Sequence, residues 1–232
     1  MAENGQKTLH DRNGADGPEV GKHVTHPPSP HFHHVANPAP LGLMGFALTT
    51  FVLSCYNAGI FGISVTSPPN VVTGLALFYG GLAQLLAGMW EFKTGNTFGA
   101  TAFASYGAFW LSYAAILIPW FGVHDGYLGH EQDVAPAIAI FLLGWTIFTF
   151  MMWFGTLKTN LALSALFAFL TVTFLLLTIA EYKGTQGHRI KRAGGFFGIF
   201  TAIIAWYLGL AGILTHDNCY FTLPVGHLNR RH

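Results

Sequence analysis

Residues 134–157 read VAPAIAIFLLGWTIFTFMMWFGTL, and this stretch contains no Asp, Glu, Lys or Arg. An apolar α-helix of about 20 residues is needed to cross the roughly 30 Å of hydrocarbon in a bilayer. The stretch therefore predicts a transmembrane helix. Charged residues are equally absent from four other long stretches, at 43–90, 94–124, 159–180 and 193–216. The spacing of these stretches predicts a chain that crosses a membrane several times.

The composition agrees with a chain whose surface faces lipid. Of the 232 residues, 52% are apolar and only 9% are charged, whereas a soluble domain carries about 25% charged residues. The formal net charge of +1 gives no long-range attraction to nucleic acid, so no nucleic-acid partner is expected. Cys55 lies inside an apolar stretch and Cys219 lies beyond the last one, so no disulfide framework is expected.

Six spans follow from the uncharged stretches. The expected fold class is therefore an all-α integral membrane protein with six transmembrane helices per protomer. We place the spans at 41–63, 71–91, 98–119, 135–156, 161–181 and 194–215. The transmembrane domain then covers residues 37–215, and a C-terminal tail covers residues 216–232.

The N-terminal segment differs in composition from the rest of the chain. Residues 1–36 are rich in Gly, Pro, His, Asn and Asp, and they bury too little apolar surface to offset the entropy of ordering. We expect a disordered polar tail without the apolar core of a signal peptide. A solvated tail is the favoured interpretation of its cluster His31, His33 and His34, with metal binding or pH sensing left open as the alternative.

Charge placement bears on the orientation in the membrane, because an even number of spans places both termini on one side. That side carries seven Lys and Arg residues, counted over the two tails, Lys93 and Lys158, against four on the other side. The positive-inside rule then predicts a multi-pass protein with cytoplasmic termini. The four opposing cations lie together in the fifth connector and argue for the reverse: Lys183, Arg189, Lys191 and Arg192.

Neutral polar side chains gather in the first three spans. Those of the first and third spans are Thr49, Thr50, Ser54, Tyr56, Asn57, Thr101, Ser105, Tyr106, Ser112 and Tyr113. In the second span Gln84 stands in a stripe of small residues with Ala76, Gly80 and Gly88. Its amide needs a polar partner or water, because an unpaired amide in hydrocarbon is costly. A single group of this kind is more often a packing feature, but together they indicate a path for a small polar solute.

Fixed charges are missing from the middle of every span, since Glu91 and Glu181 lie at span ends. A buried carboxylate relay and a buried Arg for holding an anion are therefore not expected. An anion would instead be held by hydroxyls, amides and the backbone N–H groups of helix starts, where Asn37 and Asn96 are candidate caps. Catalytic, cofactor-binding and metal-binding motifs are absent from the spans, so no enzyme, cofactor or metal is expected.

Several short blocks add a family resemblance. Residues 37–43 read NPAPLGL and continue into Met44-Gly45-Phe46; further blocks read FYGG at 78–81, GNTFG at 95–99, SYG at 105–107 and GTLK at 155–158. In this order they resemble the acetate uptake transporter family, also called the YaaH family. The long polar N-terminus resembles the fungal members.

The resemblance implies six-helix protomers that assemble as a homo-hexamer in the plasma membrane. Each protomer would carry its own path for acetate or a related small carboxylate such as succinate. A narrow hydrophobic constriction is implied at Phe46, Tyr106 and Leu170. We expect the solute to shed water there and to be held on either side by residues of the path: Asn37, Thr49, Gln84, Glu91, Asn96, Thr101, Ser105 and the small Ala205 tied to substrate choice.

Alternative interpretations remain open at this point. The solute would move either with a proton, carried on the acid itself, or through a passive channel. An ammonium exporter is a second alternative, because family members are linked to ammonium export. A membrane sensor that binds a ligand without flux belongs to a different class of protein.

Overall fold

The computed structural model describes residues 35–228. The expected disordered tail, apart from its last two residues, and its cluster His31, His33 and His34 lie outside the described residues.

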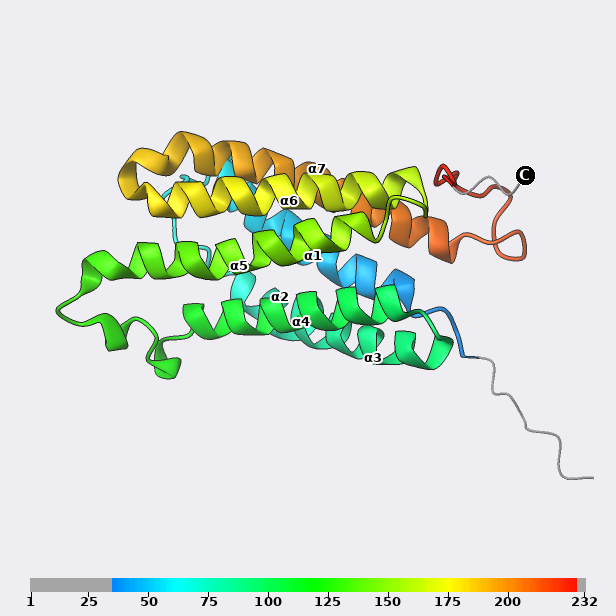
Figure 1. Cartoon of the computed structure of the whole chain (residues 1–232), viewed down its shortest axis with the longest axis horizontal. Helices are drawn as coiled ribbons and strands as arrows, with labels where there is room; N and C mark the ends of the chain where they lie inside the picture. The colour runs from blue at the N-terminus through cyan, green and yellow to red at the C-terminus, as the bar shows by residue number, and fades with distance from the viewer. Residues whose placement is uncertain (1–34, 229–232) are drawn as a thin grey trace, which may run out of the picture. The chain divides into compact units, whose positions relative to one another are not determined.

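Helices make up most of the described part of the chain (Figure 1). Six of them are long and apolar enough to cross a membrane, and the expected fold class is confirmed. The second crossing is made of α2 (Val72–Leu77), a π-helical turn η1 (Phe78–Ala83) and α3 (Gln84–Thr94). The other five crossings are α1 (Ala39–Ala58), α4 (Thr97–Leu117), α5 (Val134–Phe154), α6 (Leu161–Tyr182) and α7 (His188–Ile213). Short 3-10 turns occupy the connectors: η2 (Pro119–Phe121), η3 (Asp125–Tyr127), η4 (Glu131–Asp133) and η5 (Gly184–Gly187).

The first helix ends earlier than the hydrophobicity of the chain indicates. α1 stops at Ala58, whereas the expected span runs to residue 63. Gly59 adopts a left-handed conformation with φ 63°, and its N–H bonds back to the carbonyl oxygens of Cys55 and Tyr56. This is a glycine C-cap, which a residue without a Cβ adopts at little cost.

The last helix begins earlier than expected, at His188 instead of residue 194. The expected span begins after Arg192, the last charged residue of the connector. In the structure, Lys191 and Arg192 lie within the first turns of α7 and have partners on neighbouring helices. The Arg192 Nε donates to the carbonyl oxygen of Ala58, 3.2 Å away at the end of α1. A cation at that helix end also interacts favourably with the helix dipole.

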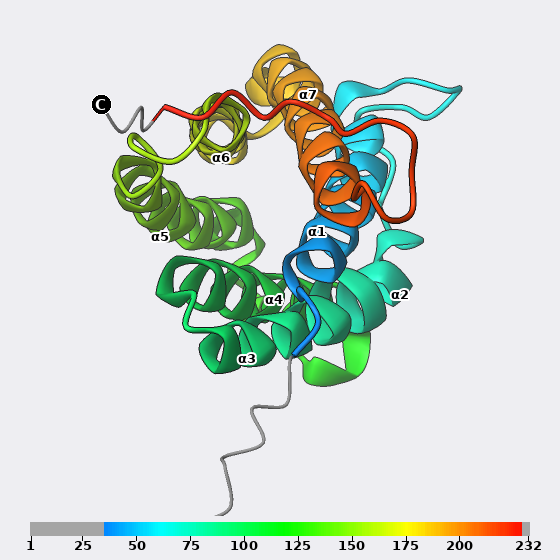
Figure 2. The ribbon, with the colours of Figure 1, turned by 90° about the vertical axis from the view of Figure 1, so that its right-hand side faces the viewer.

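The crossings form a ring when viewed along the bundle (Figure 2). α1 lies beside α7, α7 beside α6, and α6 beside α5, while α3 packs on α4. α4 meets α5 and α6 through aromatic side chains, including Tyr106 against Phe148 and Phe109 against Phe174. The space enclosed by α1, α4, α5 and α6 holds the cavities described below.

Small residues allow α7 to lie close against α1. A Cβ placed on Gly195 would come 2.7 Å from the backbone carbon of Asn57, and one on Gly198 would meet the side chain of Ser54. Ala205 lies in the same stretch of α7 and is fully buried. In lipid, where apolar surface gives no driving force, such close backbone contact is what associates helices.

Replacing Gly195 by Ala is therefore expected to destabilise the protein. The added methyl meets the backbone of α1, which cannot rotate away as a side chain can, and overpacking of this kind costs about 1–3 kcal/mol. Thermal unfolding in detergent, followed by tryptophan fluorescence, should show a clearly lower midpoint. Gly144→Ala in α5 is the matched control, because a Cβ at Gly144 meets nothing within 4 Å. An unchanged midpoint for Gly195→Ala would contradict the close contact.

The C-terminal segment returns across one end of the bundle. From α7 it passes over α6, in red in Figure 2. The N–H of Leu161 donates to the carbonyl oxygen of Gly226 at 2.7 Å, and the N–H of Ala162 to that of Val225 at 3.2 Å. These bonds use N–H groups at the start of α6 that have no partner within the helix. The described part of the expected C-terminal tail, residues 216–228, thus includes a segment docked on the start of α6.

Candidate functional site

Two cavities occupy the interior of the bundle. The larger cavity, of about 340 Å³, reaches the connectors that follow α1 and α4 and is bordered there by the end of α6 and the start of α7. The smaller cavity, of about 180 Å³, lies toward the starts of α1, α4 and α6 and is bordered there by Ala39, Asn96 and Asn160. Phe46 and Leu170 line both cavities, so these two side chains separate one space from the other.

Tyr106 completes this separation, and we call Phe46, Tyr106 and Leu170 the dividing layer. The three side chains belong to one core cluster, with exposed fractions of 5%, 3% and 3%. The ring centroids of Phe46 and Tyr106 are 5.7 Å apart. The Tyr106 hydroxyl donates to the Thr149 Oγ1 at 2.9 Å, so Tyr106 offers its ring, not its hydroxyl, to the space between the cavities.

The smaller cavity is bordered by helix starts. The Oδ1 of Asn96 accepts from the N–H of Gly99 at 3.0 Å, and the Oδ1 of Asn160 accepts from the N–H of Leu163 at 2.8 Å. Both residues are N-caps, so the positive ends of the α4 and α6 dipoles border the same small space. Such an arrangement favours a negative charge in the cavity without a fixed cation.

Gln84 supplies the smaller cavity with a buried amide. Its side chain is 1% exposed, and its Oε1 has no hydrogen-bond partner among the described residues. Gln84 opens α3 directly after the π-helical turn η1. π-helical turns inside helices are frequent at functional sites. An amide atom that is buried without a protein partner is a group ready to bind water or a polar solute.

Two further buried polar atoms without protein partners belong to residues of the larger cavity. These are the Oγ1 of Thr50 and the Nε1 of Trp110, both buried within the described part of the chain. Each can donate a hydrogen bond to an anion. Among the described residues, three of the four side chains with such an atom therefore line a cavity, and the fourth is Glu91.

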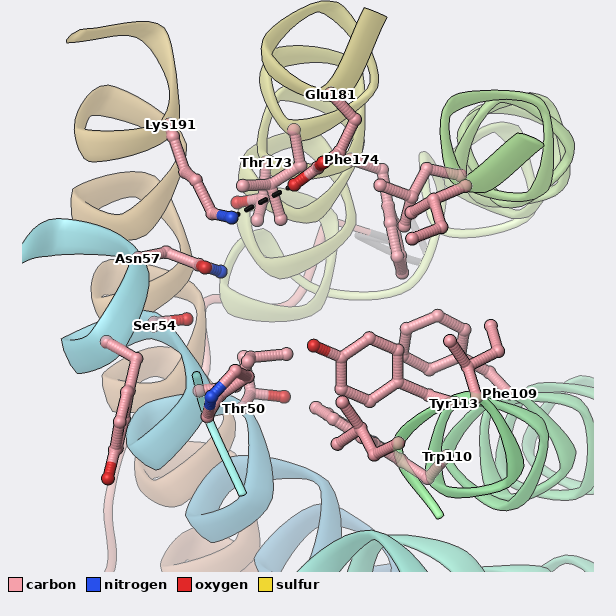
Figure 3. Close-up of a pocket in the computed structure, with 18 of the residues that line it drawn as sticks. Thr50, Ser54, Asn57, Phe109, Trp110, Tyr113, Thr173, Phe174, Glu181 and Lys191 are labelled. Carbon is pink, nitrogen blue, oxygen red and sulfur yellow. Dashed lines mark hydrogen bonds and ion pairs between the residues drawn. The ribbon is translucent and has the colours of Figure 1, made fainter. Parts of the chain in front are cut away.

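The larger cavity is the more polar of the two. Thr50, Ser54 and Asn57 follow one face of α1, and Tyr113 of α4 lies across the space from them (Figure 3). At the loop end of the cavity the Lys191 Nζ donates to the Glu181 Oε1 at 3.0 Å. The smaller cavity has no Asp, Glu, Lys or Arg among the described residues that line it.

Several of the residues expected along the path do not line either cavity. Thr49 donates to the carbonyl oxygen of Gly45 at 2.8 Å and lies against Gly80 of η1. Thr101 donates to the carbonyl oxygen of Thr97 at 2.9 Å. The remaining residues of this group are the exposed Asn37, the half-buried Ser105, the buried Ala205 and the buried Glu91.

Asn37 and Glu91 nevertheless support residues that line the smaller cavity. The Oδ1 of Asn37 accepts from the N–H of Ala39 at 3.1 Å, at the start of α1. The Glu91 Oε2 accepts from Thr94, and its carboxyl carbon lies close to Gly99 at the start of α4. These two residues thus act on the rim of the smaller cavity through its helix starts.

The cavity-lining residues that sequence reasoning missed include Trp110, Asn160, Glu181 and Lys191. Asn160 carries a usable signal, because it precedes an apolar span as Asn96 does. The ion pair carries no such signal. Glu181 and Lys191 belong to different helices and meet only because α6 and α7 turn back on each other through η5.

The comparisons with known proteins place this geometry in a family. The family model described as the GPR1/FUN34/yaaH family matches residues 21–230. The chain belongs to this family. A solved structure described as the bacterial acetate channel SatP superposes with a TM-score of 0.70 at 40% identity, covering 83% of this chain and 100% of that one. The family resemblance expected from the NPAPLGL block is confirmed.

Three relatives in this family are named as transport proteins. Ammonia transport outward protein 2 of Saccharomyces cerevisiae is 54% identical over 197 residues, which cover 83% of this chain and 68% of the relative. Acetate permease A of Emericella nidulans is 48% identical over 200 residues, covering 83% and 66%. The succinate-acetate/proton symporter SatP of Escherichia coli is 40% identical over 193 residues, covering 83% and 96%. The chain is thus a multi-pass membrane protein of a transporter family.

Proposed function

We propose that this protein is a membrane transporter or channel for acetate and related short-chain carboxylates, including succinate. The observation that carries the proposal is the pair of cavities separated only by the dividing layer. The smaller cavity has helix starts that favour a carboxylate and an unpartnered amide oxygen, the Gln84 Oε1, that can accept a hydrogen bond from a protonated acid. The names of the relatives, an acetate permease and a succinate-acetate/proton symporter, support the choice of solute.

The proposed path leads from one cavity through the dividing layer to the other. In the smaller cavity, Gln84, Asn96 and Asn160 would replace water around the solute. In the larger cavity, hydroxyls of α1 would do so. Phe46, Tyr106 and Leu170 would exclude hydrated ions, because an apolar ring of this kind strips water from a solute. Asn37, Thr49, Glu91, Thr101, Ser105 and Ala205 would support the helices that position these groups.

Proton co-movement is part of the proposal. Apart from the paired Glu181, no Asp or Glu is among the described residues that line the cavities. The proton would then cross on the acid itself, which is small and neutral when protonated. A neutral acid would also pass the apolar dividing layer at a much lower desolvation cost than its anion.

The arrangement in the cell that we propose is a homo-hexamer in the plasma membrane with cytoplasmic termini. Two of the four cations that argue against this orientation have partners within the protein, namely Lys191 with Glu181 and Arg192 with Ala58. Cations that are bonded to groups of the protein say less about which side of the membrane their loop occupies. Lys183 and Arg189 then remain against the seven on the other side.

Purified protein in liposomes provides the test. Uptake of labelled acetate is expected above that of empty liposomes, and an inward proton gradient is expected to accelerate it without generating a membrane potential. Phe46→Ser should weaken the dependence of this uptake on the proton gradient, because a small polar group in the dividing layer lets water and the hydrated anion pass. Folded protein with no acetate flux would contradict the proposal. Amine flux without acetate competition would favour ammonium export, the activity in the name of the Saccharomyces relative.

A further inference from the structure

Lys191 stands apart from the other basic residues of the chain. Among the described residues that line either cavity, it is the only Lys or Arg. Its Nζ lies 3.0 Å from the Glu181 Oε1, and the two side chains are 30% and 23% exposed. The pair therefore lines the larger cavity, and both side chains remain partly accessible to solvent.

Neutral hydrogen-bonding groups surround this pair. In Figure 3, Asn57 and Ser54 of α1 project toward the same space as the Lys191 amine, and the Tyr113 hydroxyl of α4 faces it from the opposite wall. None of these four residues is tied to another side chain by a hydrogen bond in the described part of the chain except Lys191 itself, which bonds to Glu181. An anion at the Lys191 amine would thus find further donors within the same cavity.

The bond between Lys191 and Glu181 is suited to exchange. A solvent-accessible ion pair contributes only modestly to stability, because water compensates both charges when they separate. The carboxylate of a solute offers the Lys191 amine the same chemical group that Glu181 offers. In a cleft with low-dielectric walls, one cation also raises the local concentration of anions.

We propose that Lys191 is the docking group for a monocarboxylate in the larger cavity, and that Glu181 is the internal carboxylate which the solute displaces. This inference rests on the proposed function and extends it by a specificity residue. Glu181 also disfavours a dicarboxylate, whose second negative charge would lie close to its own. The pair therefore selects for a single carboxylate at the loop end of the path.

Opposite effects of two substitutions test this proposal. Lys191→Gln removes the docking cation and is expected to raise the half-saturating acetate concentration for uptake roughly twofold to fivefold. Glu181→Gln removes the competitor and is expected to lower it about threefold. The ratio of succinate to acetate uptake should rise in Glu181→Gln. A pair that serves only to hold α6 and α7 together would be broken by both substitutions, and both would then shift the value in the same direction.

Two further variants separate local charge from the docking site. Lys191→Arg keeps a cation, so its half-saturating acetate concentration should stay near that of the wild type. Lys183→Gln removes the same charge from an exposed position in the same connector, so it should leave the value unchanged. Shifts of equal sign in Lys191→Gln and Glu181→Gln, or a shift in Lys183→Gln as large as that in Lys191→Gln, would overturn the proposal.

Equilibrium binding of labelled acetate to the purified full chain distinguishes this inference from the proposed function. If acetate binding weakens in Lys191→Gln and strengthens in Glu181→Gln but the protein shows no flux, the docking site is retained and the transport function is overturned. Flux in the wild type without the opposite shifts would retain the transport function and overturn the docking site. Folded protein with neither binding nor flux would overturn both.

Discussion

Replacing Leu170 by Ala is expected to admit larger carboxylates through the protein. The propionate-to-acetate uptake ratio should rise by about tenfold, since the fit of one extra methylene in an apolar site is worth about that factor or more. The reason is geometric, because Leu170 is one of the two side chains that line both cavities. Removing its branched end connects the cavities and widens the dividing layer. Competition of labelled acetate uptake in liposomes by acids of increasing chain length measures the effect.

Two leucines of the same helix provide matched controls for this prediction. Leu166 lines only the smaller cavity and Leu177 lines only the larger one, and both are buried in the same core as Leu170. Leu→Ala at a buried position costs about 2–5 kcal/mol of stability wherever it is made. All three variants should therefore unfold at lower temperature, but only Leu170→Ala should change the size selection. Equal size selection in the three variants would show that the dividing layer does not limit the solute.

Replacing Gln84 by Leu is expected to lower acetate uptake while raising stability. The buried Oε1 of Gln84 lacks a protein partner, and leaving such a group unsatisfied costs about 1–3 kcal/mol. An apolar side chain of similar size removes that cost, so the thermal midpoint in detergent should rise. The Oε1 can only accept a hydrogen bond, which the O–H of the protonated acid can donate, so uptake should fall roughly threefold to tenfold, the value of a hydrogen bond between neutral groups. Higher stability together with lower flux is the result expected for a residue whose role is to bind the solute and not to stabilise the fold.

The same substitution at Gln186 serves as its control. Gln186 is exposed in η5, away from both cavities, so Gln186→Leu should change neither the midpoint nor the flux appreciably. Gln84→Glu extends the test, because a carboxylate at this position repels the anion and should lower both flux and stability. Undiminished uptake in Gln84→Leu would remove Gln84 from the path.

The amino-acid sequence predicts the spans well but predicts their inward faces poorly. Thr49 and Thr50 are adjacent and chemically identical, yet Thr50 lines the larger cavity while Thr49 lies against Gly80. In a soluble helix the polar face would distinguish the two sides. A transmembrane helix faces lipid on one side and an equally apolar core on the other, so its pattern leaves the inward face undetermined.

Helix ends show the same division between local and long-range information. The caps Asn96 and Asn160 can be read locally, because an Asn before an apolar run bonds to an N–H within the next turn. That the two caps border the same cavity cannot be predicted from local sequence, since α4 and α6 are brought together only by packing. The early start of α7 was not predicted for a related reason. Charged residues normally mark the end of a span, but here Lys191 and Arg192 bond to groups on other helices and the helix includes them.

By itself, the sequence determined the number of crossings, the approximate place of each, the neutral chemistry of their polar groups and the family. These follow from hydrophobicity and short motifs, which are properties of neighbouring residues. The family resemblance implied a constriction at Phe46 and Leu170, but only the tertiary structure decided that a cavity lies on either side of them, that Gln84 is buried without a partner, and that Lys191 meets Glu181. Each of these depends on residues far apart in the chain, and their distances are set by how the helices pack.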